Sequence, residues 1–379
     1  MFSSISRAHM LGLRQTVAHR LVTRRKYSVT RIQALARPAM GPSPCRNLHW
    51  VFKVGDRTAT IRFYEDALLM EPLRHEEFTE GCAAACNGPY DGMWSKTMIG
   101  YGPEDDNFVL ELTYNYGVKS YQLGNDFLGI TIRSKRVYDN LVSKGLGTAV
   151  AFADAAAAEE DKGDSPAAPA PAPACLAVTA PDGYRFWVLN EEPPSSAPSS
   201  SAPTGSWSRS CPVTELRLHV TDLERSLAFW SGFLGFQSRR LGAPGEALLS
   251  CGPGQCQLRL VQLPEGQPLE RGTAFGRVAF ACPGEQLQQL EADVRAAGYT
   301  VHTPYVSLDT PGKATVQVVI LQDPDGHEIC FVGDAGFRDL SVRDPAAPQL
   351  LAEALDKDKS AEWFKQRAER EARMQAMGV

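Results

Sequence analysis

The sequence predicts an α+β protein built from repeats of one strand–helix–strands unit, and two kinds of landmark indicate it. Residues 48–69 and 216–236 each read as a short alternating strand, an Asp, and a helix that carries a pair of aromatic residues. Residues 180–186 and 323–329 each read as a Pro-Asp-Gly turn that leads into a strand. Because both landmarks occur twice in the same order, the chain has two similar halves.

Local sequence features predict where each helix and strand begins. Asp56 and Asp222 follow the first strand of each half, where an Asp side chain can accept backbone N–H groups and cap the helix that follows. Further strands at 128–132 and 278–282 begin a second unit within each half. The sequence therefore predicts four units of strand, helix and strands.

Composition limits the class of protein. The 379 residues allow two or three domains, and no apolar run approaches the ~20 residues that span a bilayer. The nine cysteines are odd in number and scattered, which indicates reduced thiols in an intracellular compartment. Cys82 and Cys86 lie four apart in a polar loop without further partners at zinc-site spacing, so we expect packing or surface thiols there.

The N-terminus differs from the rest of the chain in charge. Residues 1–40 hold eight Lys and Arg and no acid, so the remaining residues sum to −5 − 8 = −13. This composition is typical of an organelle transit peptide, and its Arg content favours the mitochondrion over the chloroplast. The alternative is a basic tail that binds nucleic acid, which the acidic body disfavours. We expect no nucleic-acid or membrane partner.

Two stretches have the composition of solvated spacers. Residues 154–174 are mostly Ala, Pro and charge, and residues 192–210 are rich in Ser and Pro, so neither can bury enough apolar surface to order itself. We therefore expect domains at 46–191, with the first spacer as an insertion, and at 211–334. Residues 335–379 are expected to form a helical tail.

The Asp-capped helices with their aromatic pairs and the DPDG turn resemble the vicinal oxygen chelate superfamily, which includes glyoxalase I, bleomycin-resistance proteins and extradiol dioxygenases. The segment VLELTYNYG at 109–117 is similar to the stretch of glyoxalase I that carries a metal-binding glutamate. Runs at 86–108, 114–131 and 310–334 resemble glyoxalase-domain proteins closely. The resemblance implies four βαβββ modules that form two paired-module glyoxalase-like domains, each curled around a pocket.

Strand alternation selects the residues that can face such a pocket. In the first strand, His49, Val51 and Lys53 lie opposite an apolar face. In the strand at 108–115, the polar face carries Glu111 and Asn115. A histidine and a glutamate are plausible ligands for zinc, nickel, manganese or iron.

The resemblance assigns roles to these positions. It makes His49 and Glu111 metal ligands, and it implies that Lys53 and Asn115 contact glutathione. The third and fourth ligand positions of the first half fall on Phe127 and Trp187, which cannot bind a divalent ion. Two protein ligands predict weak metal retention, and a His–Glu hydrogen-bonded pair without metal is the alternative.

In the second half, the corresponding positions are Glu215, Arg259, Arg277 and Cys330, with Glu328 on the same face as Cys330. Two arginines repel a cation and suit carboxylates. We therefore expect either an ion-pair cluster or a substrate-binding anion site in which Arg259 and Arg277 form the fork.

The sequence thus predicts a glyoxalase-like protein with a degenerate metal site. If it is active, it would be a metal-dependent lyase or isomerase of the lactoylglutathione lyase type, in which Glu111 coordinates the metal or shuttles the proton. Its ligand would be a small molecule such as a glutathione adduct. The alternative is a non-catalytic ligand-binding or scaffold protein; an extradiol dioxygenase would need a second suitable histidine. Modules could pair within halves or across them, and cross-pairing would bring Glu328 towards His49 and Glu111.

Overall fold

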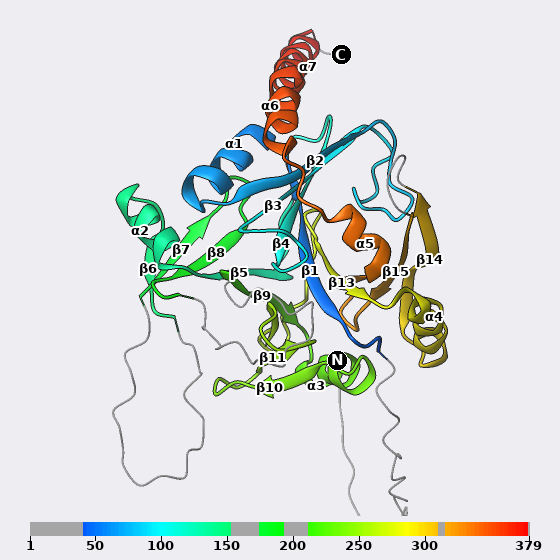
Figure 1. The fold of residues 1–379 in the computed structure, drawn as a ribbon. Helices are drawn as coiled ribbons and strands as arrows, with labels where there is room; N and C mark the ends of the chain where they lie inside the picture. Colours follow the sequence, from blue (N-terminus) through cyan, green and yellow to red (C-terminus); the bar gives the residue numbers. More distant parts are fainter. Residues whose placement is uncertain (1–40, 153–173, 193–210, 310–314, 378–379) are drawn as a thin grey trace, which may run out of the picture. The chain divides into compact units, whose positions relative to one another are not determined.

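The computed structural model describes residues 41–152, 174–192, 211–309 and 315–377, and most of its helices and strands are labelled in Figure 1. The expected transit peptide, the insertion up to residue 173 and the linker from residue 193 lie outside the described residues. Within the described part, no helix is both long and apolar enough to cross a membrane.

Four consecutive segments each fold as a strand, a helix and three further strands, which confirms the predicted α+β repeat. The first module comprises β1 Arg46–Val54, α1 Arg57–Arg62 continued by the π-helical turn η1 Phe63–Ala67, β2 Glu71–Phe78, β3 Trp94–Gly100 and β4 Val109–Asn115. The second comprises β5 Phe127–Arg133, α2 Lys135–Ser143, β6 Thr148–Val150, β7 Cys175–Thr179 and β8 Arg185–Leu189.

The other two modules repeat this order. The third comprises β9 Val213–Val220, α3 Leu223–Leu227 continued by η2 Ala228–Phe233, β10 Gln237–Arg240, β11 Glu246–Ser250 and β12 Gln257–Gln262. The fourth comprises β13 Arg277–Cys282, the 3-10 turn η3 Gly284–Gln286 leading into α4 Leu287–Ala296, β14 Thr300–Asp309, β15 Thr315–Gln322 and β16 Glu328–Gly333.

The modules pair across the two halves of the chain. One eight-stranded sheet has the order β14-β15-β16-β13-β1-β4-β3-β2, and the other has the order β10-β11-β12-β9-β5-β8-β7-β6. The first sheet therefore joins modules one and four, and the second joins modules two and three. Neither sheet is formed by 46–191 or by 211–334 alone, which answers the question that the sequence left open.

The join between modules one and four is an antiparallel pairing of β1 with β13, in which Trp50 lies opposite Val278 and Val51 opposite Arg277. The contact is close at Gly276, directly before β13, where a Cβ atom would lie 2.2 Å from Cζ2 of Trp50. Only a residue without a side chain leaves room for the indole there.

Strand alternation in β1 and β4 separates the core from the site. Trp50 and Phe52 of β1, with Leu110 and Leu112 of β4, are buried in the main hydrophobic core. The alternate residues face the other side of the sheet, as the sequence predicts. The predicted caps are also present, because Asp56 accepts the Ala59 N–H at the start of α1 and Asp222 accepts the Arg225 N–H at the start of α3.

Three helices follow the last strand: α5 Asp334–Leu340, α6 Ala347–Lys357 and α7 Ser360–Ala376. Arg57, at the start of α1, joins α6 to the first module. Its guanidinium donates to the carbonyl of Ala354 at 3.0 Å and to the carboxylate of Asp358 at 3.1 Å, and also binds Glu77 at 2.7 Å. This buried cation fixes the end of α6 against the sheet.

Candidate functional site

His49 of β1 and Glu111 of β4 face the same cavity, as alternation along the two strands predicts. Val51, two residues after His49, lies opposite Glu111 in the parallel pairing of β1 with β4. This register places Nε2 of His49 3.5 Å from Oε2 of Glu111. Both side chains are largely buried, with exposed fractions of 9% for His49 and 6% for Glu111. Thr113 donates to the other oxygen of Glu111 at 3.3 Å.

A second carboxylate orients the histidine. Oε1 of Glu104 lies 2.5 Å from Nδ1 of His49, and Oε2 accepts a hydrogen bond from Nη2 of Arg74 at 2.7 Å. Burial opposes ionisation of this carboxyl, which is 1% exposed, but His49, Arg74 and Arg46 together hold the pKa of Glu104 below its ordinary value. The contact with Glu104 at Nδ1 fixes the orientation of the His49 ring, so that Nε2 faces Glu111 and the cavity.

Glu104 was missed in the sequence because it lies in a loop rather than on a strand. The only signal was an acidic cluster, Glu104-Asp105-Asp106, shortly before β4. Periodicity cannot single out one of three adjacent acids.

Cross-pairing completes the site with residues of module four. Arg277 and Cys330 line the same cavity of about 430 Å³ as His49 and Glu111. They lie on β13 and β16, so the residues that the resemblance places at ligand positions and that line this cavity are His49, Glu111, Arg277 and Cys330. The rest of the lining has an apolar part, which includes Val316, Val318, Phe337 and Leu340, and a charged part formed by Arg74, Glu76, Glu80 and Lys96.

Arg277 is bound on two sides. Its Nε and Nη2 donate to Oε2 of Glu328 at 3.0 and 2.7 Å. Nη1 donates to the carbonyl of Ala84 at 3.0 Å, and Nη2 to the carbonyl of Ala85 at 3.2 Å. Burial opposes ionisation of Glu328, but Arg277, His302 and Arg271 hold the pKa of this carboxyl below its ordinary value. The ion-pair alternative therefore describes Arg277 in this structure.

The donor set does not fit a firmly held divalent ion. Arginine offers no lone pair and cannot be deprotonated in a protein. Burial, together with Glu111 and Glu328, raises the pKa of the Cys330 thiol to about 11 although Arg277 opposes the shift, so a metal ion would have to displace the thiol proton before this sulfur could bind it. Among the residues that the structure describes, no three or more His, Cys, Asp or Glu side chains gather as a metal site. Of the four residues His49, Glu111, Arg277 and Cys330, His49 and Glu111 are therefore the two that can coordinate a divalent ion without losing a raised-pKa proton.

Phe127 and Trp187 do not belong to this cavity, so their assignment as its third and fourth positions is wrong. They lie on β5 and β8 of the other sheet. The ring of Phe127 stacks on that of Trp50 at a centroid distance of 5.5 Å, within the core. The physical reason is that β1 pairs with β13 and β5 pairs with β9, so the halves exchange modules.

The two arginines expected to form one anion-binding fork are also separated. Arg259 lies on β12 of the second sheet, where its Nε and Nη2 donate to Oε2 of Glu246 at 2.8 and 2.6 Å. Glu215 lies 3.6 Å from its Nη1. Because Arg277 lies in the other sheet, a joint fork of the two is wrong, and each arginine has its own carboxylate partner.

Lys53 and Asn115 are both buried, and neither is among the residues that line the cavity over His49 and Glu111. Nζ of Lys53 donates to the carbonyl of Phe275 at 2.8 Å and lies 3.3 Å from the centroid of its ring. Burial is the main reason that the pKa of Lys53 falls to about 7. The amide of Asn115 donates to the carbonyl of Asn87 at 3.2 Å and to the hydroxyl of Tyr121 at 2.9 Å.

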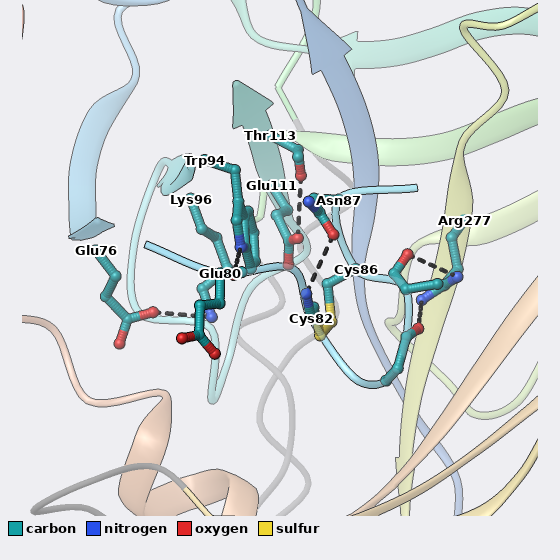
Figure 2. Close-up of a disulfide and its surroundings, with 12 residues drawn as sticks. Glu76, Glu80, Cys82, Cys86, Asn87, Trp94, Lys96, Glu111, Thr113 and Arg277 are labelled. Atoms are coloured by element: carbon teal, nitrogen blue, oxygen red, sulfur yellow. Dashed lines mark hydrogen bonds and ion pairs between the residues drawn. A yellow bond between two sulfur atoms is a disulfide. The ribbon is translucent and has the colours of Figure 1, made fainter. Parts of the chain in front are cut away.

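Cys82 and Cys86 form a disulfide, drawn in Figure 2, so the expectation of free thiols is wrong for this pair. Both residues line the cavity. The sequence shows their spacing of four but not the tight loop that brings the sulfur atoms together. The other seven cysteines are free.

Comparisons with known proteins identify the relatives of this chain. The model of the family described as "Glyoxalase domain-containing protein 4-like, C-terminal domain" matches residues 222–340. Glyoxalase domain-containing protein 4 of Mus musculus is 46% identical over 320 residues, which cover 84% of this chain and 95% of that protein. Glyoxalase 1 of Caenorhabditis briggsae is 44% identical over 328 residues, covering 84% and 99%.

Among solved structures, a mutant of glyoxalase I from Zea mays superposes with a TM-score of 0.57, covering 79% of this chain and 97% of that one. At 22% identity this similarity establishes the fold alone.

Proposed function

Because the chain belongs to the family of glyoxalase domain-containing protein 4, we propose that the cavity over His49 and Glu111 is a glyoxalase I-type site with a degenerate metal centre. One observation supports the proposal most: His49, Glu111, Arg277 and Cys330, the residues that the resemblance places at ligand positions, all line this one cavity. Two of these keep the ligand chemistry and two have lost it.

The ligand class follows from the cavity and from the relatives. A volume of about 430 Å³ is in the range of small-molecule sites. Relatives named glyoxalase 1 cover almost the whole fold, which supports a glutathione hemithioacetal as the substrate. The apolar wall of Val316, Val318 and Phe337 would take the carbon skeleton of the adduct.

The chemistry of this site is proton transfer. The Glu111 carboxylate would remove the proton from the carbon that bears the hydroxyl and the sulfur, and return it to the neighbouring carbonyl carbon. The hydroxyl proton would pass to the former carbonyl oxygen, so that the hemithioacetal becomes the thioester of a 2-hydroxy acid. His49, oriented by Glu104, would form a hydrogen bond with a substrate oxygen through Nε2. With two ligand-type residues in place of four, we expect weak metal retention and slow turnover.

The test is turnover of the methylglyoxal–glutathione hemithioacetal by the full chain, followed by thioester absorbance, with and without added Zn²⁺, Ni²⁺, Mn²⁺ or Fe²⁺. We expect low activity that falls at least tenfold in Glu111→Gln. A matched control is Glu224→Gln, an exposed carboxylate paired with Arg240. Activity that Glu111→Gln leaves unchanged would remove this residue from the chemistry.

The alternative of a non-catalytic binding protein has one observation in its favour. The Arg277–Glu328 ion pair fills the third ligand position with a cation that is already neutralised. In that case an S-alkyl glutathione would bind, Arg277→Met would weaken its binding, and no preparation would turn over the hemithioacetal.

A further inference from the structure

The connection between β2 and β3, residues 79–93, carries the disulfide to the edge of the cavity. Figure 2 shows Cys82 and Cys86 in this loop between Glu111 and Arg277. Both cysteines are half-buried, and both belong to the cavity lining. A small molecule in the cavity is therefore next to the sulfur atoms.

The segment between the two cysteines is bound to the charged wall of the cavity. The carbonyls of Ala84 and Ala85 are the acceptors of Arg277, at 3.0 and 3.2 Å. Ala85 has a φ of 51°, in the left-handed region that a residue with a Cβ rarely adopts. The closed ring thus holds two adjacent carbonyls in the conformation that receives the guanidinium.

The loop is also joined to the opposite wall. The backbone N–H of Cys82 donates to Oδ1 of Asn87 at 3.3 Å, and Asn115 of β4 donates to the carbonyl of Asn87 at 3.2 Å. Nε1 of Trp94 donates to the carbonyl of Glu80 at 2.9 Å. A change in the ring can therefore reach β13 through Arg277 and β4 through Asn115.

The position of the bond argues against a purely stabilising role. The cysteines are four residues apart, and closing so short a loop restricts the unfolded chain far less than closing a long one. Neither cysteine lies in a helix or strand, so the bond can open without breaking a ladder of the sheet. These features are typical of a disulfide that undergoes thiol–disulfide exchange, rather than of one that stabilises the fold.

We propose that Cys82–Cys86 is a thiol–disulfide exchange site for low-molecular-weight thiols that enter the cavity. The thiolate of one such molecule attacks a sulfur of the pair, breaks the S–S bond and forms a mixed disulfide, and the released cysteine takes up a proton. A second small thiol then attacks the mixed disulfide. The net reaction converts the protein disulfide and two small thiols into the protein dithiol and one small-molecule disulfide, and it reverses when that disulfide is in excess.

Reduction has a defined consequence in the cavity. Without the bond, Ala84 and Ala85 are no longer held in a ring, and their hydrogen bonds to Arg277 loosen. The redox state of the loop then sets how firmly Arg277 is held beside His49 and Glu111. The proposal needs a thiol in the cavity and does not depend on turnover of a hemithioacetal.

The experiment titrates the native full chain with glutathione buffers of graded reduced-to-oxidised ratio, followed by alkylation and peptide mass spectrometry. We expect the Cys82–Cys86 pair to pass from disulfide to dithiol within that range, while the buried thiols of Cys175 and Cys211 remain unalkylated. In Cys86→Ser, oxidised glutathione should leave a mixed disulfide on Cys82, and 2-mercaptoethanol should release it. A matched control is Cys251→Ser, which removes a half-buried thiol outside the loop and should leave the titration unchanged.

A pair that resists reduction until the protein is denatured, or a Cys86→Ser variant that forms no mixed disulfide, would overturn the proposal. Amide hydrogen exchange gives the second measurement. Residues 79–93 should exchange at least tenfold faster in the reduced protein than in the oxidised one, and equal rates would refute the link to Arg277. A failed hemithioacetal assay would leave both results unaffected, so the two proposals are tested separately.

Discussion

Replacing Glu104 with Gln tests whether this loop carboxylate orients the site. The change keeps the shape and one carbonyl oxygen but removes the charge that faces His49 at 2.5 Å and Arg74 at 2.7 Å. Removing one partner of a buried ion pair costs about 3–5 kcal/mol, because the remaining charge stays buried. Arg74 keeps the carbonyl of Leu340 at 2.6 Å as an acceptor, so we expect the low end, about 3 kcal/mol of the free energy of unfolding.

The assay is urea unfolding of the full chain at pH 7, with Glu224→Gln as the exposed control. That control should cost at most about 1 kcal/mol, since exposed ion pairs contribute little. Because Arg74 is the charge left unpaired, Arg74→Met combined with Glu104→Gln should be less destabilising than the sum of the single changes. NMR of the His49 ring nitrogens should also show a changed tautomer balance in Glu104→Gln. A loss below about 1 kcal/mol with an unchanged ring spectrum would refute the reasoning.

Three further outcomes are expected. Arg277→His should increase the metal retained after gel filtration, because it replaces a cation in the cavity by a ligand, whereas Arg259→His in the other sheet should not. Burial lowers the pKa of Lys53 to about 7 in the folded chain, whereas the unfolded chain releases this proton near pH 10.4. The free energy of unfolding should therefore rise with pH between these two values, by up to about 1.4 kcal/mol per pH unit. In urea titrations, Lys53→Met should flatten that rise. Import should remove roughly the first 27–40 residues, so the N-terminal sequence of the mature protein from mitochondria should begin within residues 28–41, and a mature chain that begins at Met1 would contradict import.

Local physics made much of the fold predictable. Alternation in β1 separated His49 and Val51 from Trp50 and Phe52, because strand side chains must alternate between the core and the other face. The caps at Asp56 and Asp222 followed from the need of a helix N-terminus for acceptors.

Long-range pairing was not predictable in this way. The choice of β13 over β5 as the partner of β1 depends on contacts between residues more than two hundred positions apart, such as Trp50 with Gly276. The third and fourth ligand positions depended on that choice, so Phe127 and Trp187 were assigned in place of Arg277 and Cys330. The disulfide and Glu104 lie in loops, where no period marks the residues that face inward.

The central claim is that this cavity has kept half of a glyoxalase I metal centre. The most direct measurement is the metal content of the full chain after it is loaded with Zn²⁺ or Ni²⁺ and passed through gel filtration, with hemithioacetal turnover measured on the same fractions. The account predicts well under one metal ion per chain and slow turnover that His49→Ala and Glu111→Gln abolish. One firmly held ion per chain with rapid turnover would contradict it, because Arg277 has no lone pair to offer and the Cys330 thiol would have to lose its proton to join His49 and Glu111 as a ligand.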